Sequence, residues 1–471
     1  MFEHQRVSPL FTDYYQLTMA QAYFKGGHHE ETACFDYFFR KIPYSGGYVV
    51  FAGLEEAVRL LEGLRFSEDD LSYLRSLGFG QDFLDYLAGF RFRGSIYGMQ
   101  EGEVVFPYEP ILRVEGTLLE AQLVETLLLN CLNFQSLIAT KASRIRRSAG
   151  ERVLSDFGLR RAQSFGAMSA SRAAIIGGFN STSNVLAARE YGIPPVGTMA
   201  HSYVESFPSE LEAFRAYAKI FPDKCTLLVD TYNTLKSGLP NAIRVGLELE
   251  QAGHQLKGIR LDSGDLAYLA KKARAMLDEA GLAYVKIVVS NQLDEFVIKS
   301  LLDQEAPIDI FGVGTNLVIG KPDGAIDGVY KLASAAGKPR LKISDNLKKI
   351  TLPGEKRVLR YLDADGMFYA DCVILSDEAS PQRMVHPFER EKSLDLSGLE
   401  FEELFHCHMS DGKAVSGRVS LDVLRDKVQA RLEKLPEEHK RFHYPHIYKV
   451  GISRDLAGLR DSLFKSYQNF I

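Results

Sequence analysis

The chain has 471 residues, of which 46% are hydrophobic and 25% are charged, and its formal net charge is −5 at pH 7. This length predicts two domains, and this composition is that of a globular protein with enough apolar residues for a core. The negative charge excludes a general attraction to nucleic acid, so a phosphate group would have to be bound by local basic residues or backbone amides.

Cysteine usage and the N-terminus predict the compartment. The cysteines form no Cys-x-x-Cys pair and are spread over positions 34, 131, 225, 372 and 407. This pattern favours a reducing compartment over a disulfide framework. The N-terminal Met1-Phe-Glu-His-Gln lacks the basic and apolar regions of a signal peptide, and no run approaches the roughly 18 apolar residues of a membrane span. We therefore expect a cytoplasmic protein.

Residues 1–132 make up the first predicted domain, which mixes helices with short strands. Its first helix begins near Thr12, where capping residues precede good helix formers, and Tyr14 and Tyr15 lie at that start. From the residues alone, these tyrosines are interpreted as aromatics that pack on a neighbouring element. The later elements are predicted to be a strand at 33–40, a helix at 53–61, short antiparallel strands between 92 and 115, and a helix at 118–147 interrupted near 130–134.

Residues 133–340 form the second predicted domain, in which short apolar runs alternate with helical patterns. This alternation implies βαβ units and a parallel sheet, and about seven or eight strands in a row favour closure into an α/β barrel. The expected strands are 152–155, 174–177, 195–199, 226–230, 257–261, 285–290, 308–313 and 329–333. The expected helices are 182–191, 208–220, 240–253, 265–280 and 291–304.

Several of these strands end in ionisable side chains. His201 follows the third strand, Asp230 ends the fourth, and the fifth ends in Arg260 with Asp262 and Asp265. Because active sites of α/β folds lie at the carboxyl ends of the strands, we expect these groups to share one site. A histidine backed by a carboxylate can accept a phosphoryl group, since the acid fixes its tautomer and stabilises the charged ring.

Other strand ends suit a flat ring and phosphate groups. Phe157 stands beside a glycine and close to Arg160, a combination that suits an aromatic anion, although a capping aspartate with surface arginines would look similar. The loop 177–184 opens a helix whose backbone amides could bind an anion. The Gly-rich turn at 311–316 could bring further N–H groups against a phosphate. The sequence contains no Walker A motif, so ATP would have to be handled at the same site.

Six segments in this order resemble one family. They are Thr12-Asp-Tyr-Tyr-Gln-Leu-Thr-Met, Asp156-Phe-Gly-Leu-Arg-Arg, Gly177-Gly-Phe-Asn-Ser-Thr-Ser-Asn-Val, Gly197-Thr-Met-Ala-His-Ser, Arg260-Leu-Asp-Ser-Gly-Asp-Leu and Phe311-Gly-Val-Gly-Thr-Asn. The chain resembles the nicotinate phosphoribosyltransferases, of the type II phosphoribosyltransferase fold. The resemblance implies a TIM-like α/β barrel and a second α+β domain, in which residues 341–471 pack on the N-terminal segment.

The resemblance also implies a reaction. Nicotinate and phosphoribosyl pyrophosphate (PRPP) would form nicotinate mononucleotide and pyrophosphate, with ATP hydrolysis coupled through a phosphohistidine, in NAD biosynthesis. Mg²⁺ would be the cofactor, and a homodimer would share its active sites. His201 matches the phosphorylated histidine and Asp230 the acid that orients it. Arg260 would lie near the nicotinate carboxylate, while Asp262 and Asp265 would position ribose hydroxyls or, tentatively, the magnesium ion.

The same resemblance assigns the substrate-binding residues. Phe157 would stack on the pyridine ring, opposite Tyr15 from a second subunit. Ser183 matches the position at which nicotinamide-using relatives carry an aspartate, and a plain helix-capping role is the alternative for it. The 5′-phosphate of the ribose would be held by Arg160, Gly312, Gly314 and Thr315.

Three other functions remain open from the sequence. A nicotinamide phosphoribosyltransferase would favour an acidic residue in the loop 177–184, which has none. A quinolinate phosphoribosyltransferase would need more basic residues and no phosphorylatable histidine. A non-enzymatic nucleotide-sensing barrel would have no need to keep His201, Asp230 and the 260–265 set together.

The C-terminal residues 341–471 carry less information. Short strands are expected at 342–351, 356–361 and 371–375. The histidines of this segment lack the spacing of a zinc site and have no paired cysteines, so a zinc site is not favoured.

Overall fold

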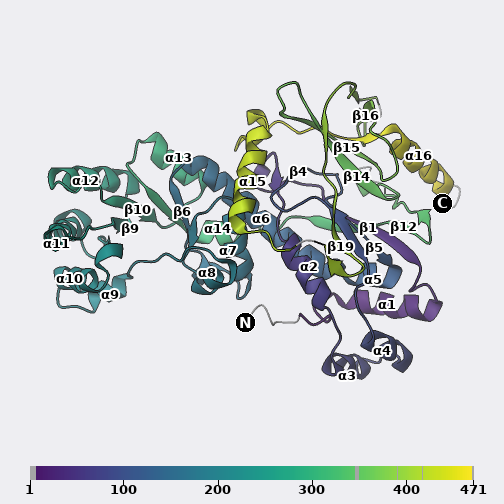
Figure 1. Ribbon diagram of the computed structural model, residues 1–471, viewed down its shortest axis with the longest axis horizontal. Helices are drawn as coiled ribbons and strands as arrows, with labels where there is room; N and C mark the ends of the chain where they lie inside the picture. The colour runs from purple at the N-terminus through teal and green to yellow at the C-terminus, as the bar shows by residue number, and fades with distance from the viewer. Residues whose placement is uncertain (1–6, 345–348, 390, 416, 469–471) are drawn as a thin grey trace. The chain divides into compact units, whose positions relative to one another are not determined.

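The computed structural model describes residues 7–344, 349–389, 391–415 and 417–468. The chain forms two compact units: unit 1 contains residues 1–137 and 325–471, and unit 2 contains residues 138–324 (Figure 1). The unit borders fall after Leu137 and Gly324, whereas the sequence placed the domain borders after residues 132 and 340. Within the described residues, no helix is both long and apolar enough to cross a bilayer.

Unit 1 contains a seven-stranded antiparallel sheet in the order β13-β12-β1-β5-β3-β19-β20. Its strands come from both chain segments: β1 (Thr32–Phe39), β3 (Ser95–Gly98), β5 (Leu112–Thr117), β12 (Gly328–Ala335), β13 (Lys338–Pro339), β19 (His406–Ser410) and β20 (Lys413–Ala414). The predicted strand at 329–333 is therefore present, but it pairs with β1 of unit 1 and belongs to no barrel.

Helices of the N-terminal segment supply much of the apolar core of unit 1. They are α1 (Tyr14–Gly26), α2 (Leu54–Gly63), α3 (Glu68–Ser76), α4 (Gln81–Ala88), α5 (Leu118–Leu123) and the first part of α6 (Glu125–Ala149), with a two-stranded sheet of β2 (Val49–Val50) and β4 (Val104–Val105). The expected interruption of the long helix near 130–134 is wrong. The break lies at Val124, which ends α5, and α6 then continues through residues 130–134.

A second sheet of unit 1 is built from the C-terminal segment, in the order β17-β16-β21-β15-β14-β18. Its elements are β14 (Lys356–Leu362), β15 (Phe368–Leu375), β16 (Arg383–Val385), β17 (Ser393–Asp395), β18 (Phe401–Glu403) and β21 (Val450–Ser453), with helices α15 (Leu421–Lys434) and α16 (Arg454–Gln468). The strands at 356–361 and 371–375 are confirmed. Residues 342–344 and 349–351 form no strand, and residues 345–348 of that expected strand lie outside the described residues.

Unit 2 is a parallel α/β unit with the strand order β7-β6-β11-β10-β9-β8. Its strands are β6 (Val153–Asp156), β7 (Ser181–Thr182), β8 (Thr226–Leu228), β9 (Gly258–Leu261), β10 (Lys286–Ser290) and β11 (Ile310–Val313). Its helices are α7 (Gly166–Ile176), α8 (Val185–Tyr191), α9 (His201–Glu205), α10 (Glu210–Ile220), α11 (Leu239–Gln251), α12 (Leu266–Glu279), α13 (Glu295–Asp303) and α14 (Thr315–Val318). Helices α10 to α13 flank the strands (Figure 1).

The predicted barrel is not closed in unit 2, all of whose residues the structure describes. The run at 195–199 makes only a single bridge, between Thr182 and Pro195. Two successive prolines, Pro194 and Pro195, lack the N–H groups that a longer ladder would need. The run at 174–177 lies mainly in α7 instead of in a strand, and the run at 329–333 lies in unit 1. The fold is therefore a mixed α/β fold with an open parallel sheet.

Candidate active site

Arg260 and Asp262 form one compact polar cluster with Ser290 at the ends of β9 and β10. Arg260 Nε donates to Ser290 Oγ at 2.9 Å, and Arg260 Nη2 donates to Asp262 Oδ1 at 2.8 Å. Ser290 Oγ in turn donates to Asp262 Oδ1. Arg260 Nη1 also donates to Thr198 Oγ1 at 3.2 Å. The Arg260 guanidinium is thus held in one position, and only 15% of the surface of the Arg260 side chain is exposed.

Phe157 places an aromatic ring beside this guanidinium. The Arg260 Cζ atom lies 5.5 Å from the Phe157 ring centroid. The ring also covers Gly312 at the end of β11, where an added Cβ would lie 2.4 Å from Phe157 Cε2. A fixed cation next to an aromatic face is suited to a flat, anionic ring, because stacking and charge act on the same ligand.

Asp156 supports the turn that carries Phe157. Its buried carboxylate accepts from Gly158 N at 2.8 Å, from Ser171 Oγ at 2.7 Å and from Thr182 Oγ1 at 2.8 Å. Burial raises the pKa of Asp156, and these hydrogen bonds oppose that rise. Asp156 is therefore a structural residue that connects β6 to α7 and β7.

His201 begins α9 and has a half-exposed side chain. Its Nδ1 lies 3.0 Å from Thr231 Oγ1, and its Nε2 lies 3.9 Å from Asp262 Oδ2. Asp230, which was expected to orient the ring, makes different contacts: its Oδ2 accepts from Asp262 N at 2.9 Å and from Ser263 Oγ at 2.6 Å. Asp230 thereby fixes the loop after β9, and Thr231 is the residue in contact with His201 Nδ1.

Ser183 lies between β7 and α8, and it is not the cap of that helix. The cap is Asn184, whose Oδ1 accepts from Ala187 N at 3.2 Å. The Ser183 backbone N–H donates to the Asp156 carbonyl at 2.8 Å. The capping alternative for Ser183 is therefore wrong, and its hydroxyl is not needed to start α8.

The remaining predicted residues have varied surroundings. Asp265 is exposed and caps α12 through a 3.0 Å hydrogen bond from Tyr268 N to its Oδ1. Gly314 and Thr315 lie at the start of α14, next to the end of β11, and Arg160 is exposed in a short 3-10 turn. Tyr15 belongs to unit 1, where it stands in the first turn of α1 with 49% of its surface exposed.

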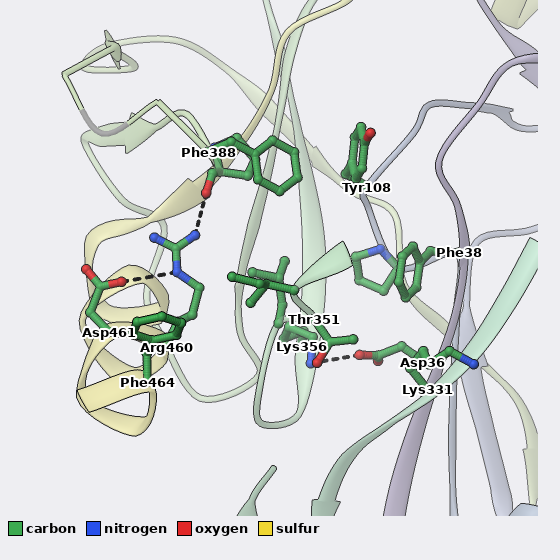
Figure 2. Close-up of a pocket in the computed structure, with 14 residues that line it drawn as sticks. Asp36, Phe38, Tyr108, Lys331, Thr351, Lys356, Phe388, Arg460, Asp461 and Phe464 are labelled. Atoms are coloured by element: carbon green, nitrogen blue, oxygen red, sulfur yellow. Dashed lines mark hydrogen bonds and ion pairs between the residues drawn. The ribbon is translucent and has the colours of Figure 1, made fainter. Parts of the chain in front are cut away.

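A separate cavity of about 320 Å³ lies in unit 1 (Figure 2). Phe38, Tyr108 and Phe388 line it, and the Asp36–Lys356 ion pair, at 2.8 Å, closes one side. None of the residues predicted for the site is among those that line this cavity. The cavity is thus distinct from the strand-end cluster.

Among the described residues, no group of three or more His, Cys, Asp or Glu side chains is arranged to hold a metal ion. His408 Nε2 lies 3.0 Å from the Gly98 carbonyl, and His439 Nδ1 lies 2.7 Å from the His446 carbonyl. These two rings are therefore engaged in structural hydrogen bonds, and burial lowers the pKa of both.

The hydroxyl groups that hold the charged residues were not predicted from the sequence. Thr198 and Ser290 fix Arg260, and Thr231 contacts His201. The only signal for them is their position, since each stands at or just after a predicted strand end. Serine and threonine are too common at such places for the pattern alone to assign a role.

Comparisons with known proteins identify the family of this chain. Models of the nicotinate phosphoribosyltransferase N-terminal domain, family and C-terminal domain match residues 10–133, 153–390 and 355–460. A nicotinate phosphoribosyltransferase from Bacillus subtilis is 46% identical over 95% of this chain and 93% of its own length. The Homo sapiens nicotinate phosphoribosyltransferase is 34% identical, over 97% of this chain and 96% of its own.

A solved structure shows the same fold. The crystal structure of the human nicotinic acid phosphoribosyltransferase matches with a TM-score of 0.87 and 33% identity, over 96% of this chain and 99% of that chain. The match covers both units, and the family models include the segments that carry Phe157, His201 and Arg260. The sequence similarity and the shared fold show, in agreement with the cluster of residues described above, that the chain belongs to the nicotinate phosphoribosyltransferase family of enzymes.

Proposed function

We propose that this chain transfers the phosphoribosyl group of PRPP to nicotinate at the strand ends of unit 2. The observation that carries this proposal is the pairing of Phe157 with Arg260, which offers a stacking face and a cation to one planar carboxylate. The nicotinate nitrogen forms a bond to C1 of the ribose as the bond from C1 to pyrophosphate breaks. The products are nicotinate mononucleotide and pyrophosphate.

Fixed charges around the ribose support this step. The reacting C1 carries positive charge as the bond to pyrophosphate breaks, so a nearby carboxylate stabilises the transition state. Asp262 can serve here, because its Oδ1 is held by Arg260 and Ser290 while its side chain remains 28% exposed. The phosphate end of PRPP is assigned to the turn of Gly312, Gly314 and Thr315, with Arg160 as a basic neighbour.

The donor set also fits a magnesium ion held jointly with substrate. Mg²⁺ usually takes one or two carboxylates and completes its shell with water and substrate phosphates. Asp262 and Asp265 each accept a hydrogen bond through Oδ1, which leaves the Oδ2 atom of each as the ligand for the ion. When bound, Mg²⁺ would neutralise charge on the pyrophosphate.

ATP is proposed to act through His201. Phosphorylation of the ring would couple ATP hydrolysis to the ribosyl transfer. If His201 carries only the phosphoryl group, His201→Ala should abolish nicotinate-stimulated ATP hydrolysis, while slow ribosyl transfer survives because the stacking and phosphate-binding groups remain. Equal loss of both activities, in a variant that still binds nicotinate, would make His201 a participant in the ribosyl step.

The substrate is tested by a product assay. Purified chain is incubated with PRPP and nicotinate, nicotinamide or quinolinate, each with and without ATP, and nucleotide products are separated by chromatography. We expect nicotinate mononucleotide as the main product and stimulation of its formation by ATP. A preference for nicotinamide or quinolinate would replace the substrate assignment, and no product with any of them would favour a sensor. Ser183 and the lack of an acidic residue in 177–184 argue against nicotinamide.

A further inference from the structure

Thr231 lies beside one nitrogen of the His201 ring. It follows Asp230 just after β8, and its Oγ1 lies 3.0 Å from His201 Nδ1. Asp230 Oδ2 accepts from Asp262 N and Ser263 Oγ, and Asp230 Oδ1 is buried with no hydrogen-bond partner among the described residues. The two neighbouring residues therefore divide their tasks, with Asp230 holding the loop after β9 and Thr231 contacting the ring.

The two nitrogens of His201 consequently have different surroundings. Nδ1 is engaged by a hydroxyl, whereas the nearest carboxylate oxygen to Nε2, Asp262 Oδ2, is 3.9 Å away and too distant for a hydrogen bond. A neutral imidazole has one N–H donor and one lone pair, and the partner of one nitrogen sets the role of the other. If Nδ1–H donates to Thr231, the lone pair lies on Nε2.

We propose that Thr231 is the positioning residue of His201 and makes Nε2 the nitrogen that accepts the phosphoryl group. This inference rests on the proposed coupling to ATP. The Nε2 lone pair forms a bond to the terminal phosphorus of the nucleoside triphosphate as the bond from that phosphorus to the bridging oxygen breaks. The electron pair of that bond leaves with the nucleoside diphosphate. Nδ1 keeps its proton, which Thr231 Oγ1 accepts.

A hydroxyl has a specific advantage in this position. Its oxygen accepts from Nδ1–H, so it holds the ring plane, leaves the lone pair on Nε2 and adds no charge. Valine has nearly the same shape as threonine but cannot accept this hydrogen bond. Serine keeps the hydroxyl and loses only a methyl group. The pair Thr231→Val and Thr231→Ser therefore separates the hydrogen bond from packing.

The main test measures the rate and the position of phosphorylation. Chains are treated with ATP, and the two phosphohistidine isomers are quantified by ³¹P NMR and isomer-specific antibodies. Wild type should carry the Nε2 isomer. Thr231→Val should form phosphohistidine at least about tenfold more slowly and with a larger Nδ1 fraction, whereas Thr231→Ser should stay within about threefold of wild type. Thr226→Val, at the start of β8, is the control for the loss of another threonine hydroxyl in the same part of the chain.

Three results would overturn the assignment. They are an unchanged rate and isomer ratio in Thr231→Val, a Thr231→Ser variant as defective as Thr231→Val, and Nδ1 phosphorylation in wild type. The isomer ratio matters most, because a loss of packing alone slows the reaction without moving the phosphoryl group to the other nitrogen.

A second measurement separates this inference from the ATP coupling itself. The ¹⁵N shifts of the His201 ring, assigned by comparison with His201→Gln, report the Nδ1 hydrogen bond without any reaction. Thr231→Val should change the Nδ1 shift, and Asp230→Asn should change it much less. If wild type forms no phosphohistidine but the shift behaves in this way, the coupling is wrong and the positioning role stands. An unchanged Nδ1 shift in Thr231→Val sinks the positioning role as well.

Discussion

Ser183 is the residue at which the choice of pyridine substrate can be tested. Its side chain is half-buried, and Asn184 carries the cap of α8, so a change at Ser183 leaves the helix start intact. An aspartate there would place a second negative charge near the nicotinate carboxylate. Two like charges about 4 Å apart repel by about 4 kcal/mol at an effective dielectric constant of about 20. Ser183→Asp should therefore lower kcat/KM for nicotinate by at least about tenfold, equivalent to ~1.4 kcal/mol.

Nicotinamide provides the comparison in the same preparation. Its amide can donate to the new carboxylate, so its kcat/KM should fall far less than that of nicotinate, or rise. Ser183→Asn is the matched control, because it has the size of aspartate without the charge. A uniform loss for both substrates in Ser183→Asp and Ser183→Asn alike would show that size, and not charge, is what matters at this position.

The site residues that could be placed together from the sequence are those with charged side chains. Arg260 and Asp262 were expected together and do meet, at 2.8 Å, and His201 Nε2 lies 3.9 Å from Asp262 Oδ2. The expected contact between Asp230 and His201 is replaced by one with Thr231. A single strand end presents neighbouring residues in different directions, so adjacency in sequence does not decide which of two side chains reaches a third.

At the scale of elements, the end of β11 determines the position of the Phe157 ring. Gly312 pairs with Ser155 of β6, and its missing Cβ leaves the space that the Phe157 ring occupies. Gly312→Ala should push the ring away while sparing the backbone, since the closest atoms belong to a side chain. We expect KM for nicotinate to rise at least about fivefold, equivalent to about 1 kcal/mol of lost stacking.

The control for this change is Gly324→Ala, at a position where an added Cβ meets nothing within 4 Å. Steady-state kinetics and thermal unfolding of both variants distinguish a local effect from a folding defect. Unchanged kinetics in Gly312→Ala would contradict the stacking role of Phe157.

Long amphipathic helices and most short strands were predicted well, whereas the apolar runs at 174–177 and 195–199 were wrongly taken as strands. The helices at 208–220, 240–253, 265–280 and 291–304 all occur close to their expected bounds, because their apolar periodicity persists over several turns. The run at 174–177 reads equally as buried helix or buried strand, and it lies in α7. The partner of β12 could not be read from local pattern, since β1 is separated from it by all of unit 2.

On the scale of the whole molecule, stability depends on a buried ionic network in unit 1. Arg360 is fully buried and donates to Asp371 Oδ1 at 2.8 Å and to Glu103 Oε1 at 2.6 Å. Nearby Glu109 is also fully buried, and its Oε2 has no hydrogen-bond partner within the described part of the chain. Burial, and then the charge of Asp371, hold the pKa of Glu109 well above its usual range, although Arg360 opposes this.

Because of this raised pKa, the contribution of Glu109 to the free energy of unfolding falls as pH rises. Above the usual glutamate pKa of about 4.3, the unfolded chain releases a proton that folded Glu109 still keeps. The free energy of unfolding therefore decreases as pH rises from there towards the pKa of the folded state. Glu109→Gln should remove this loss and raise the free energy of unfolding at pH 8 by about 1 kcal/mol or more, with little change at pH 4.

Urea unfolding curves at several pH values check this expectation. Glu103→Gln serves as the contrast, because Glu103 accepts from both Arg360 and Arg431, and its loss should destabilise the fold at neutral pH. A Glu109→Gln variant that is less stable than wild type at pH 8 would show that Glu109 is ionised and favourable in the fold.

A dimer is predicted from Tyr15 of unit 1 and Phe157 of unit 2. Tyr15 is half exposed on α1, and the family resemblance places it over the pyridine ring bound in the site of the other subunit, opposite Phe157. We expect a dimer with two composite sites. Mixing inactive Tyr15→Ala and Phe157→Ala chains should restore activity, because one site of each mixed dimer keeps both aromatics. No recovery in chains shown to exchange would rule out a shared site, and chains that stay monomeric in sedimentation would rule out the dimer.

The discontinuous construction of unit 1 also sets an order of events during synthesis. The ribosome completes β1 and β5 early, but the other neighbour of β1, strand β12, follows only after every residue of unit 2. Until then β1 presents an open edge on the nascent chain, and such edges invite pairing with other chains. Unit 2 can fold while it waits, as one continuous stretch. We therefore expect the N-terminal third of a newly made chain to stay open to incorrect pairing for longer than unit 2 does.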